Sequence, residues 1–265
     1  MISNLINFGL GVINMEFYSE FSKNYDKIFP LNDKKLELID NTFKDLKDKK
    51  DDIKLLDVGC GTGSYSIALA EKGYQLQAVD IDAEMISIAE SKIEAARVNV
   101  DFYRLGMLHL KEKFKDASFD GIYIIGNVLV HLQKEEIKEF LKLAAELLKA
   151  GGKIFIQIVN YYRILELDLD GLPTIYSQDD SVRFERDYKY AEEKNVIYFI
   201  TRLIDHFNDQ ILSKNKIELY PLCRSELEAD LNQAGFKIKN VYGNSNGDQF
   251  RELNSIPLIM TAEKK

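Results

Sequence analysis

The sequence predicts an α/β protein with an open, mostly parallel sheet, helices on both faces and an antiparallel insertion. Two observations lead to this fold class. Apolar, strand-like runs alternate with amphipathic, helix-like segments over residues 33–159 and again after residue 224, which is the order of a parallel sheet with crossover helices. Between residues 182 and 190, apolar and polar side chains instead alternate with a period of two, as in an antiparallel strand with one wet face.

Each element before residue 160 has a local signal. Asn32 or Asp33 caps the first helix. The run 119–125 is apolar except for Asp120, as expected of a strand buried on both faces. The pair Gly151-Gly152 is expected to end the helix over 134–148. The expected elements are helices over 33–48, 64–72, 83–96 and 134–148, and strands over 53–58, 75–80, 98–103, 119–125 and 154–159.

The rest of the chain contains the insertion and then returns to the parallel pattern. Three antiparallel strands are expected over 182–190, 196–207 and 212–220, followed by a helix over 224–234 and strands over 236–242 and 256–262. The expected parts are residues 1–173 with the N-terminal segment and core, the insertion 174–220, and the return to the core at 221–265. The insertion follows the fifth strand at the edge where open α/β sheets bind ligands, so it is a candidate substrate lid; packing on another subunit is the alternative.

Composition restricts the class of protein. The 265 residues suffice for one large α/β domain with an insertion. A net charge of −8 does not suit a phosphate backbone, so a nucleic acid is not expected as a partner. Cys60 and Cys223 lie far apart in the sequence and fit a reduced, cytoplasmic protein. No apolar stretch approaches the roughly 18 residues that a membrane span needs, and residues 1–14 lack the basic start and cleavage site of a signal peptide.

Residues 55–80 carry the strongest functional signal. They read LLDVGCGTGSYSIALAEKGYQLQAVD: one strand ends at Asp57, a turn with three alternate glycines follows, and a second strand ends at Asp80. Such glycines let a ligand approach the backbone, and an acid about 20 positions further on accepts hydrogen bonds from ribose. Asp80 lies 17 positions after Gly63 (80 − 63). The spacing is G-x-G-x-G, unlike the G-x-G-x-x-G of nicotinamide and flavin enzymes, and Asp57 before the turn indicates a site for a cation or an amine.

At these residues the chain resembles the class I S-adenosylmethionine-dependent methyltransferases, whose first motif has the form of Asp57-Val58-Gly59-Cys60-Gly61-Thr62-Gly63 and whose second ends in an acid placed like Asp80. The resemblance implies a Rossmann-like seven-stranded sheet with an antiparallel last strand, and S-adenosylmethionine as cofactor. It implies that Asp57 contacts the methionine end, that Asp80 holds the ribose and that Ile81 lies against the adenine. The candidate cofactor-binding residues are Tyr25, Asp57, Gly59, Cys60, Gly61, Thr62, Gly63, Asp80, Ile81, Met85, Gly106, Met107 and Gly126.

One position departs from the family pattern. Gly106, after the third strand, stands where the family has an acidic residue near the adenine amino group, and glycine has no side chain for that contact. A backbone contact or packing by Met107 is expected to replace it.

The segments after the fourth and fifth strands indicate which kind of molecule receives the methyl group. The fourth is followed by IIGNVLVHL, without the Asn/Asp-Pro-Pro-aromatic motif of many methyltransferases that act on base amines or glutamine. Gly126-Asn127 and His131 there resemble the glycine and sarcosine N-methyltransferase branch, and so do Asn160-Tyr161 and Arg163 in IVNYYRIL after the fifth. This resemblance implies His131, Asn127 and Tyr161 as catalytic residues and Asn160 as a substrate residue. Arg163 and Arg186, the latter in the insertion, are further candidate substrate residues because an arginine fork binds a carboxylate. A structural histidine and solvated arginines are the alternatives.

The sequence therefore predicts an enzyme that transfers a methyl group in line from S-adenosylmethionine to a small molecule, with an amine nitrogen preferred over a hydroxyl or carboxylate oxygen. A metal is not expected, because no paired His or Cys has ligand spacing. The alternatives are a nicotinamide-dependent oxidoreductase and a non-catalytic module that binds the cofactor to regulate a partner. Monomer and homodimer are both compatible with the sequence.

Overall fold

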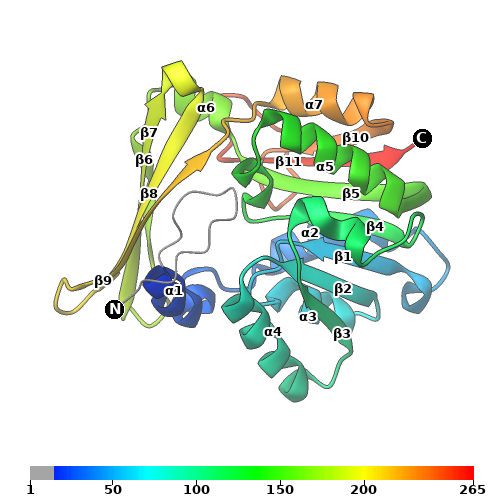
Figure 1. Cartoon of the computed structure of the whole chain (residues 1–265), viewed down its shortest axis with the longest axis horizontal. Helices are drawn as coiled ribbons and strands as arrows, with labels where there is room; N and C mark the ends of the chain where they lie inside the picture. The colour runs from blue at the N-terminus through cyan, green and yellow to red at the C-terminus, as the bar shows by residue number, and fades with distance from the viewer. Residues whose placement is uncertain (1–14) are drawn as a thin grey trace. The chain divides into compact units, whose positions relative to one another are not determined.

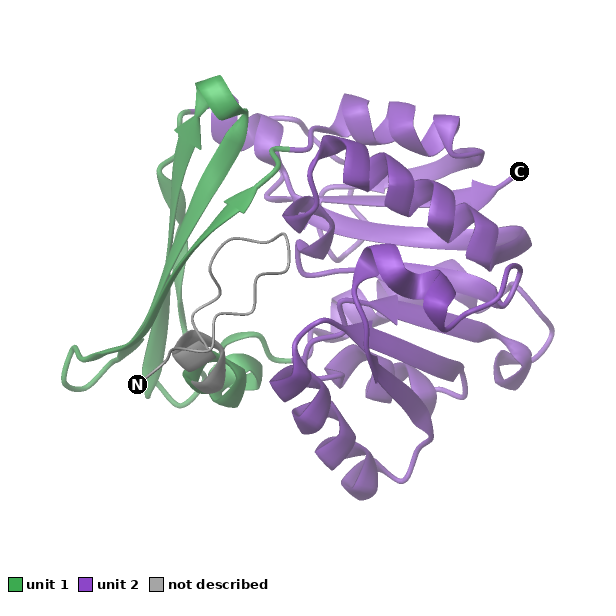
Figure 2. Cartoon of the chain, in the orientation of Figure 1, with its two compact units in different colours: residues 1–30, 168–221 green, residues 31–167, 222–265 purple. Residues whose placement is uncertain are grey.

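The structure, a computed structural model, describes residues 15–265, with side chains from residue 20 onward. The expectation about a signal peptide concerns residues 1–14 and lies outside this range. The described chain divides into two compact units (Figure 2), one with residues 15–30 and 168–221, the other with Leu31–Leu167 and Leu222–Lys265. The N-terminal segment thus groups with the antiparallel insertion, whereas the sequence analysis placed it with the core sheet.

The larger unit is built on a seven-stranded sheet in the order β10-β11-β5-β4-β1-β2-β3 (Figure 1). Neighbours among β1 to β5 pair in parallel, and β11 is antiparallel to both β5 and β10, which confirms the Rossmann-like fold and its antiparallel last strand. The strands are β1 (Lys54–Val58), β2 (Gln75–Asp80), β3 (Val100–Arg104), β4 (Phe119–Ile124), β5 (Leu148–Val159), β10 (Phe236–Tyr242) and β11 (Pro257–Lys264).

Helices connect these strands and bury the sheet. They are α2 (Asp33–Phe43), α3 (Ser64–Glu71), α4 (Ala83–Ala96), α5 (Lys134–Leu147), α6 (Tyr161–Glu166) and α7 (Arg224–Gln233), with short 3₁₀ turns η1 (Lys50–Asp52), η2 (Met107–Glu112) and η3 (Val128–His131). Tyr123 of β4 belongs to a core cluster that includes side chains of α2, α3 and α4. Ile122 and Ile124, which point to the other side of the strand, are equally buried, so both faces of β4 are covered as predicted.

Two boundaries differ from the sequence prediction for physical reasons. Helix α2 ends at Phe43 rather than near residue 48, where the N–H of Leu46 donates to the carbonyl of Phe43 in a tighter turn. Strand β5 begins at Leu148, before the glycines that were expected to end the helix. Gly151 has a φ of +72° and lies where the register with β4 shifts, so the glycine pair forms a bulge within the strand.

The smaller unit is a four-stranded antiparallel sheet with one helix, α1 (Met15–Ile28). Its strands, in sheet order, are β6 (Gly171–Tyr176), β7 (Val182–Ala191), β8 (Val196–Asp205) and β9 (Ile211–Leu219), with the turn η4 (Glu192–Lys194) between β7 and β8. Val182, Phe184 and Leu203 form a core with Ile28. Tyr188 on the same face of β7 is buried as expected, but Tyr190 is exposed, so the predicted apolar face ends at Tyr188.

The insertion has four strands and not the three expected from the sequence, because β6 was not predicted. Gly171 and Pro173 are residue types that argue against a strand, and both are tolerated because β6 is an edge strand. The backbone of Gly171 lies so close to the carbonyl of Arg186 that no Cβ fits. Pro173 lies where the register with β7 shifts. Across residues 15–265 no helix has the length and apolar character needed to cross a membrane.

Candidate functional site

The glycine turn after β1 is anchored to the end of β2. The backbone N–H groups of Gly59 and Cys60 both donate to the carbonyl of Val79, at 2.8 and 3.0 Å. Gly59, Gly61 and Gly63 have φ values of +76°, +54° and +74°, a left-handed region that favours glycine. A Cβ on Gly59 would lie 2.5 Å from Cγ1 of Val128, so the turn packs directly against the segment that follows β4.

Asp80, at the carboxyl end of β2, is held beside this turn. One carboxylate oxygen accepts a hydrogen bond from the N–H of Gly61 at 2.8 Å, and the other accepts from the N–H of Asp82 at 3.0 Å. Burial raises the pKa of Asp80, and these backbone donors oppose the shift. Because a carboxylate has about four lone-pair sites, the group still has acceptor capacity for ligand hydroxyls.

Asp57 is a buried carboxyl group with one unsatisfied oxygen. Oδ2 accepts a hydrogen bond from the hydroxyl of Ser66 at 2.5 Å, while Oδ1 is buried with no hydrogen-bond partner in the described part of the chain. Burial raises the pKa of Asp57 to about 7, the nearby hydroxyl groups of Ser66 and Tyr123 act against this shift, and the charge of Asp80 adds to it. An orphaned buried carboxylate oxygen is costly, so it fits a site completed by a cationic ligand group.

Two carboxyl groups and the glycine turn therefore suit the predicted cofactor. A ligand with a ribose at Asp80 and an ammonium at Asp57 satisfies both groups. Ser66 was missed by the sequence analysis, although it stands in the first turn of α3, directly after the glycines.

Asn127 and Tyr161, two of the predicted catalytic residues, contact each other directly. The amide nitrogen of Asn127 donates to the hydroxyl of Tyr161 at 2.8 Å, and its amide oxygen accepts from the N–H of Val159 at 2.9 Å. The N–H of Gly126 donates to the side-chain oxygen of Gln157 at 3.1 Å. Tyr161 is fully buried. These bonds tie the segment after β4 to the end of β5, so the geometry assigns Asn127 and Tyr161 a positioning role.

His131 has a different environment at the end of η3. Its side chain is half-buried, and no hydrogen-bond partner is found among the described residues. Burial lowers the pKa of His131 to about 4, so the ring is neutral at pH 7. A neutral imidazole with a free nitrogen accepts a hydrogen bond, but with this pKa it is a weak general base.

Asn160 is committed to the backbone and leaves no free amide hydrogen for a substrate. Its nitrogen donates to the carbonyls of Glu252 and Ser255, at 2.7 and 2.9 Å, and its oxygen caps α6 by accepting from the N–H of Arg163 at 3.3 Å. Nε of Arg163 donates to the carbonyl of Leu253 at 3.1 Å. The side chain of Asn160, which was predicted to bind substrate, thus caps helix α6 and binds backbone carbonyls in this structure.

Arg186, on β7 of the smaller unit, forms no ion pair with a carboxylate among the side chains that the structure describes. Its Nη2 donates to the carbonyl of Pro173 at 2.5 Å, and its Nε is buried with no hydrogen-bond partner in residues 15–265. Burial lowers the pKa of Arg186, and no carboxylate offsets this effect. Arg202 on the neighbouring strand contrasts with it, since it binds Glu185 and Asp187, each at 2.7 Å.

The other predicted cofactor residues lie in the larger unit, except Tyr25, which lies in the smaller one. Cys60, Thr62 and Met85 are half-buried or buried in the larger unit, and burial raises the pKa of the Cys60 thiol well above its ordinary value, which does not suit a nucleophile. Ile81 remains 49% exposed, while Met107 is half-buried. The ring of Tyr25 packs against Phe21 and Phe29 in the smaller unit, with centroids 5.6 and 5.2 Å away.

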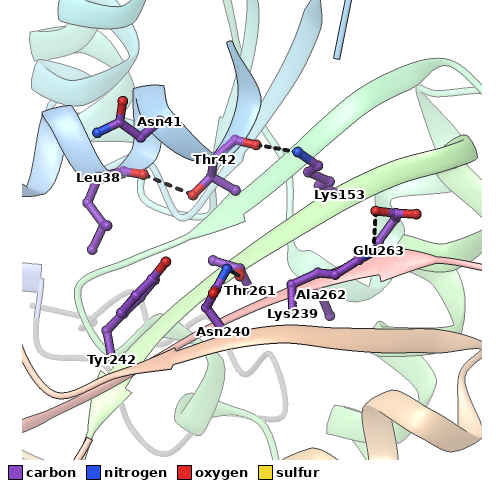
Figure 3. Close-up of a pocket in the computed structure, with 10 residues that line it drawn as sticks. All are labelled: Leu38, Asn41, Thr42, Lys153, Lys239, Asn240, Tyr242, Thr261, Ala262 and Glu263. Carbon is purple, nitrogen blue, oxygen red and sulfur yellow. Dashed lines mark hydrogen bonds and ion pairs between the residues drawn. The ribbon is translucent and has the colours of Figure 1, made fainter. Parts of the chain in front are cut away.

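A separate cavity of about 270 Å³ lies between α2 and strands β5, β10 and β11 (Figure 3). None of the predicted site residues lines it. Its charged groups already bind one another or the backbone: Lys239 pairs with Glu263 at 2.8 Å, and Lys153 donates to the carbonyl of Thr42 at 3.0 Å. It adjoins the early part of β5, whereas the glycine turn follows the carboxyl end of β1, so it is not part of the site. Within residues 15–265 no cluster of His, Cys, Asp or Glu side chains suits a metal ion.

Comparisons with known proteins agree with this geometry. A family model described as a methyltransferase domain matches residues 55–152, which include the glycine turn. The chain is 27% identical over 197 residues to a provisionally described methyltransferase of Geobacillus sp. (strain WCH70), covering 71% of this chain and 75% of that one. It is 29% identical over 197 residues to the glycine/sarcosine N-methyltransferase of Aphanothece halophytica, covering 72% and 68%. An S-adenosylmethionine-dependent methyltransferase from Clostridium acetobutylicum ATCC 824 shares the fold, with a TM-score of 0.76, 18% identity, and coverage of 93% of this chain and 98% of that chain.

Proposed function

Because the chain is a class I S-adenosylmethionine-dependent methyltransferase, we propose that it methylates a small molecule, with an amine nitrogen as the methylated atom. S-adenosylmethionine is the methyl donor, and a nicotinamide cofactor or a purely regulatory module does not agree with this family. The small-molecule acceptor is supported by the relation to a glycine/sarcosine N-methyltransferase. The nitrogen preference is supported by Gly126-Asn127 and His131, which resemble that branch.

The residues of the chain bind the cofactor and orient the acceptor, because the sulfonium of the bound cofactor supplies an already activated methyl group. The observation that carries the proposal is the buried Oδ1 of Asp57, which has no hydrogen-bond partner in the described part of the chain. In the proposed complex this oxygen accepts a hydrogen bond from the ammonium of the cofactor. Asp80 holds the ribose hydroxyls. Asn127 and Tyr161 fix the segment that carries His131, whose neutral ring accepts a hydrogen bond from the acceptor nitrogen. Such orientation supplies roughly 7–11 kcal/mol of barrier reduction in well-aligned reactions.

The acceptor class is tested by a screen of small amines, amino acids, phenols and carboxylic acids for conversion of S-adenosylmethionine to S-adenosylhomocysteine. We expect turnover with amine-bearing compounds. Turnover that is confined to phenols or carboxylic acids would contradict the nitrogen assignment but leave the methyltransferase assignment in place.

Asp80→Asn is expected to weaken S-adenosylmethionine binding by tenfold or more. The change keeps one acceptor oxygen for the turn but removes the charge, and hydrogen bonds to an ionised group are worth on the order of 1.5–3 kcal/mol each. Titration calorimetry measures the loss. Asp101→Asn is the matched control, because Asp101 is an exposed acid on β3 that binds Gln77 at 3.2 Å. Equal affinity in both variants would remove the ribose role of Asp80.

Arg186→Met is expected to raise KM for a carboxylate-bearing acceptor by about tenfold or more, since hydrogen bonds to charged groups contribute on the order of 1.5–3 kcal/mol. The free Nε of Arg186 supports an anion-binding role. The melting temperature should stay equal or rise, because the variant removes an unsatisfied buried donor. Steady-state kinetics with an acceptor from the screen measure the effect. Arg202→Met, which breaks two ion pairs, serves as control; an effect on KM of the same size there would rule out a specific role for Arg186.

A further inference from the structure

We propose that His109 recognises the amino group of the cofactor's adenine, in place of the acid that is missing at Gly106. This inference rests on the proposed function, since it takes the ribose of S-adenosylmethionine to be held by Asp80. The base is bonded to that ribose, so it must lie beside the carboxyl ends of β2 and β3.

Two hydrogen bonds join the ends of these strands. The N–H of Leu105 donates to the carbonyl of Asp80 at 2.9 Å, and Nε of Arg104 donates to the carbonyl of Ile81 at 3.2 Å. Ile81 therefore stands directly next to the segment that leads into Gly106. With 49% of its surface exposed, Ile81 offers an apolar platform for a flat base.

Gly106 lies close to both Ile81 and His109. A Cβ at this position would lie 3.8 Å from Cδ1 of Ile81 and 3.4 Å from Cδ2 of His109. The backbone of Gly106 is extended, with a φ of −79°, so this glycine is not required by its conformation. The ring edge of His109 thus occupies the surroundings that a longer side chain at Gly106 would enter.

The hydrogen bonding of His109 makes its other nitrogen an acceptor. Nδ1 lies 2.9 Å from the carboxylate of Glu112, which holds the ring proton on Nδ1 in the neutral imidazole. Nε2, the atom next to Cδ2, then carries a free lone pair. The exocyclic amino group of adenine is a donor, so Nε2 replaces the acceptor oxygen of an acid. The His109 side chain is 64% exposed and thus open to a ligand.

The test compares two ligands in four proteins by titration calorimetry. S-adenosylhomocysteine carries the amino group, whereas S-inosylhomocysteine has a carbonyl in its place. We expect the wild-type protein to prefer the adenosyl compound by about three- to tenfold, the effect of one uncharged hydrogen bond. His109→Ala should remove this preference, and Gly106→Asp in the same chain should restore it, because the acid then supplies the acceptor. His206→Ala, at an exposed histidine of the smaller unit, should leave the preference unchanged.

The outcomes separate the inference from the proposed function. A wild-type protein that binds neither compound overturns the cofactor assignment and this inference with it. Normal binding with a preference that survives in His109→Ala overturns the inference alone, as does a wild-type protein without preference. The surface pair of His109 and Glu112 adds little to folding, so a loss of affinity in a variant with unchanged melting temperature reports on the ligand contact.

Discussion

Asp57→Asn is expected to weaken S-adenosylmethionine binding by about 10- to 150-fold while it stabilises the ligand-free protein above pH 7. The affinity loss follows from removing a charged partner of the ammonium, a contact worth on the order of 1.5–3 kcal/mol. The gain in stability has the opposite sign because Asp57 is buried with an unsatisfied oxygen when no ligand is bound. One substitution should therefore separate ligand binding from folding.

The sign of the pH dependence follows from proton linkage. The pKa of Asp57 is raised from 3.8 to about 7 in the folded state, so the folded protein holds this proton over a pH range in which the unfolded chain has lost it. The free energy of unfolding therefore falls as the pH rises from about 4 to about 7. The complete shift corresponds to about 4 kcal/mol. We expect Asp57→Asn to recover about 1–3 kcal/mol of it, because the new amide brings its own buried donors.

Thermal melting between pH 4 and pH 8 measures this effect, and calorimetry at pH 6, 7 and 8 measures affinity. Wild-type affinity should fall by up to about tenfold per pH unit below pH 7, as Asp57 takes up a proton, whereas the variant should show no such slope. Asp120→Asn is the control. Asp120 is also buried, but hydrogen bonds from Lys47 and Lys149 outweigh burial and lower its pKa, so its replacement should destabilise the protein. A destabilised Asp57→Asn variant with normal affinity would contradict both parts of the prediction.

Gly61→Val is expected to abolish S-adenosylmethionine binding. Gly61 has a φ of +54° and donates its N–H to Asp80, so a β-branched side chain strains the turn. In the proposed complex it also enters the space of the cofactor. Gly235→Val is the control for backbone strain, because Gly235 also has a positive φ, of +91°, and a new Cβ there meets nothing within 4 Å. Both variants should lose stability, by about 1–2 kcal/mol from the left-handed backbone.

Only the first of these variants should lose the ligand. Melting curves establish that each variant folds, and calorimetry then compares their affinities. Normal binding by a folded Gly61→Val variant would mean that the turn serves the fold and that the cofactor lies elsewhere.

The sequence was most informative where a function depends on consecutive residues. The glycine turn, Asp57 and Asp80 lie within residues 55–80, and the alternation of strands and helices brings both acids to the carboxyl edge of one sheet. The period of two over residues 182–190 also predicted β7, because Val182, Phe184 and Tyr188 on one side of that strand are buried. It did not predict β6, because an edge strand accepts Gly171 and Pro173, which the statistics of central strands exclude.

The sequence by itself determined the class of fold and the cofactor, and it predicted two acids as the groups that hold this cofactor, because these inferences follow from local spacing and residue type. Only the tertiary structure decided how each polar group is satisfied. The amide nitrogen of Asn160 donates both its hydrogens to the carbonyls of residues 252 and 255. Arg186 has a buried Nε with no hydrogen-bond partner in the described part of the chain. His109 is not among the candidate residues predicted from the sequence, but the fold places its ring beside Gly106. Hydrogen-bond satisfaction depends on neighbours that are distant in the chain, and for that reason it appears only once the chain is folded.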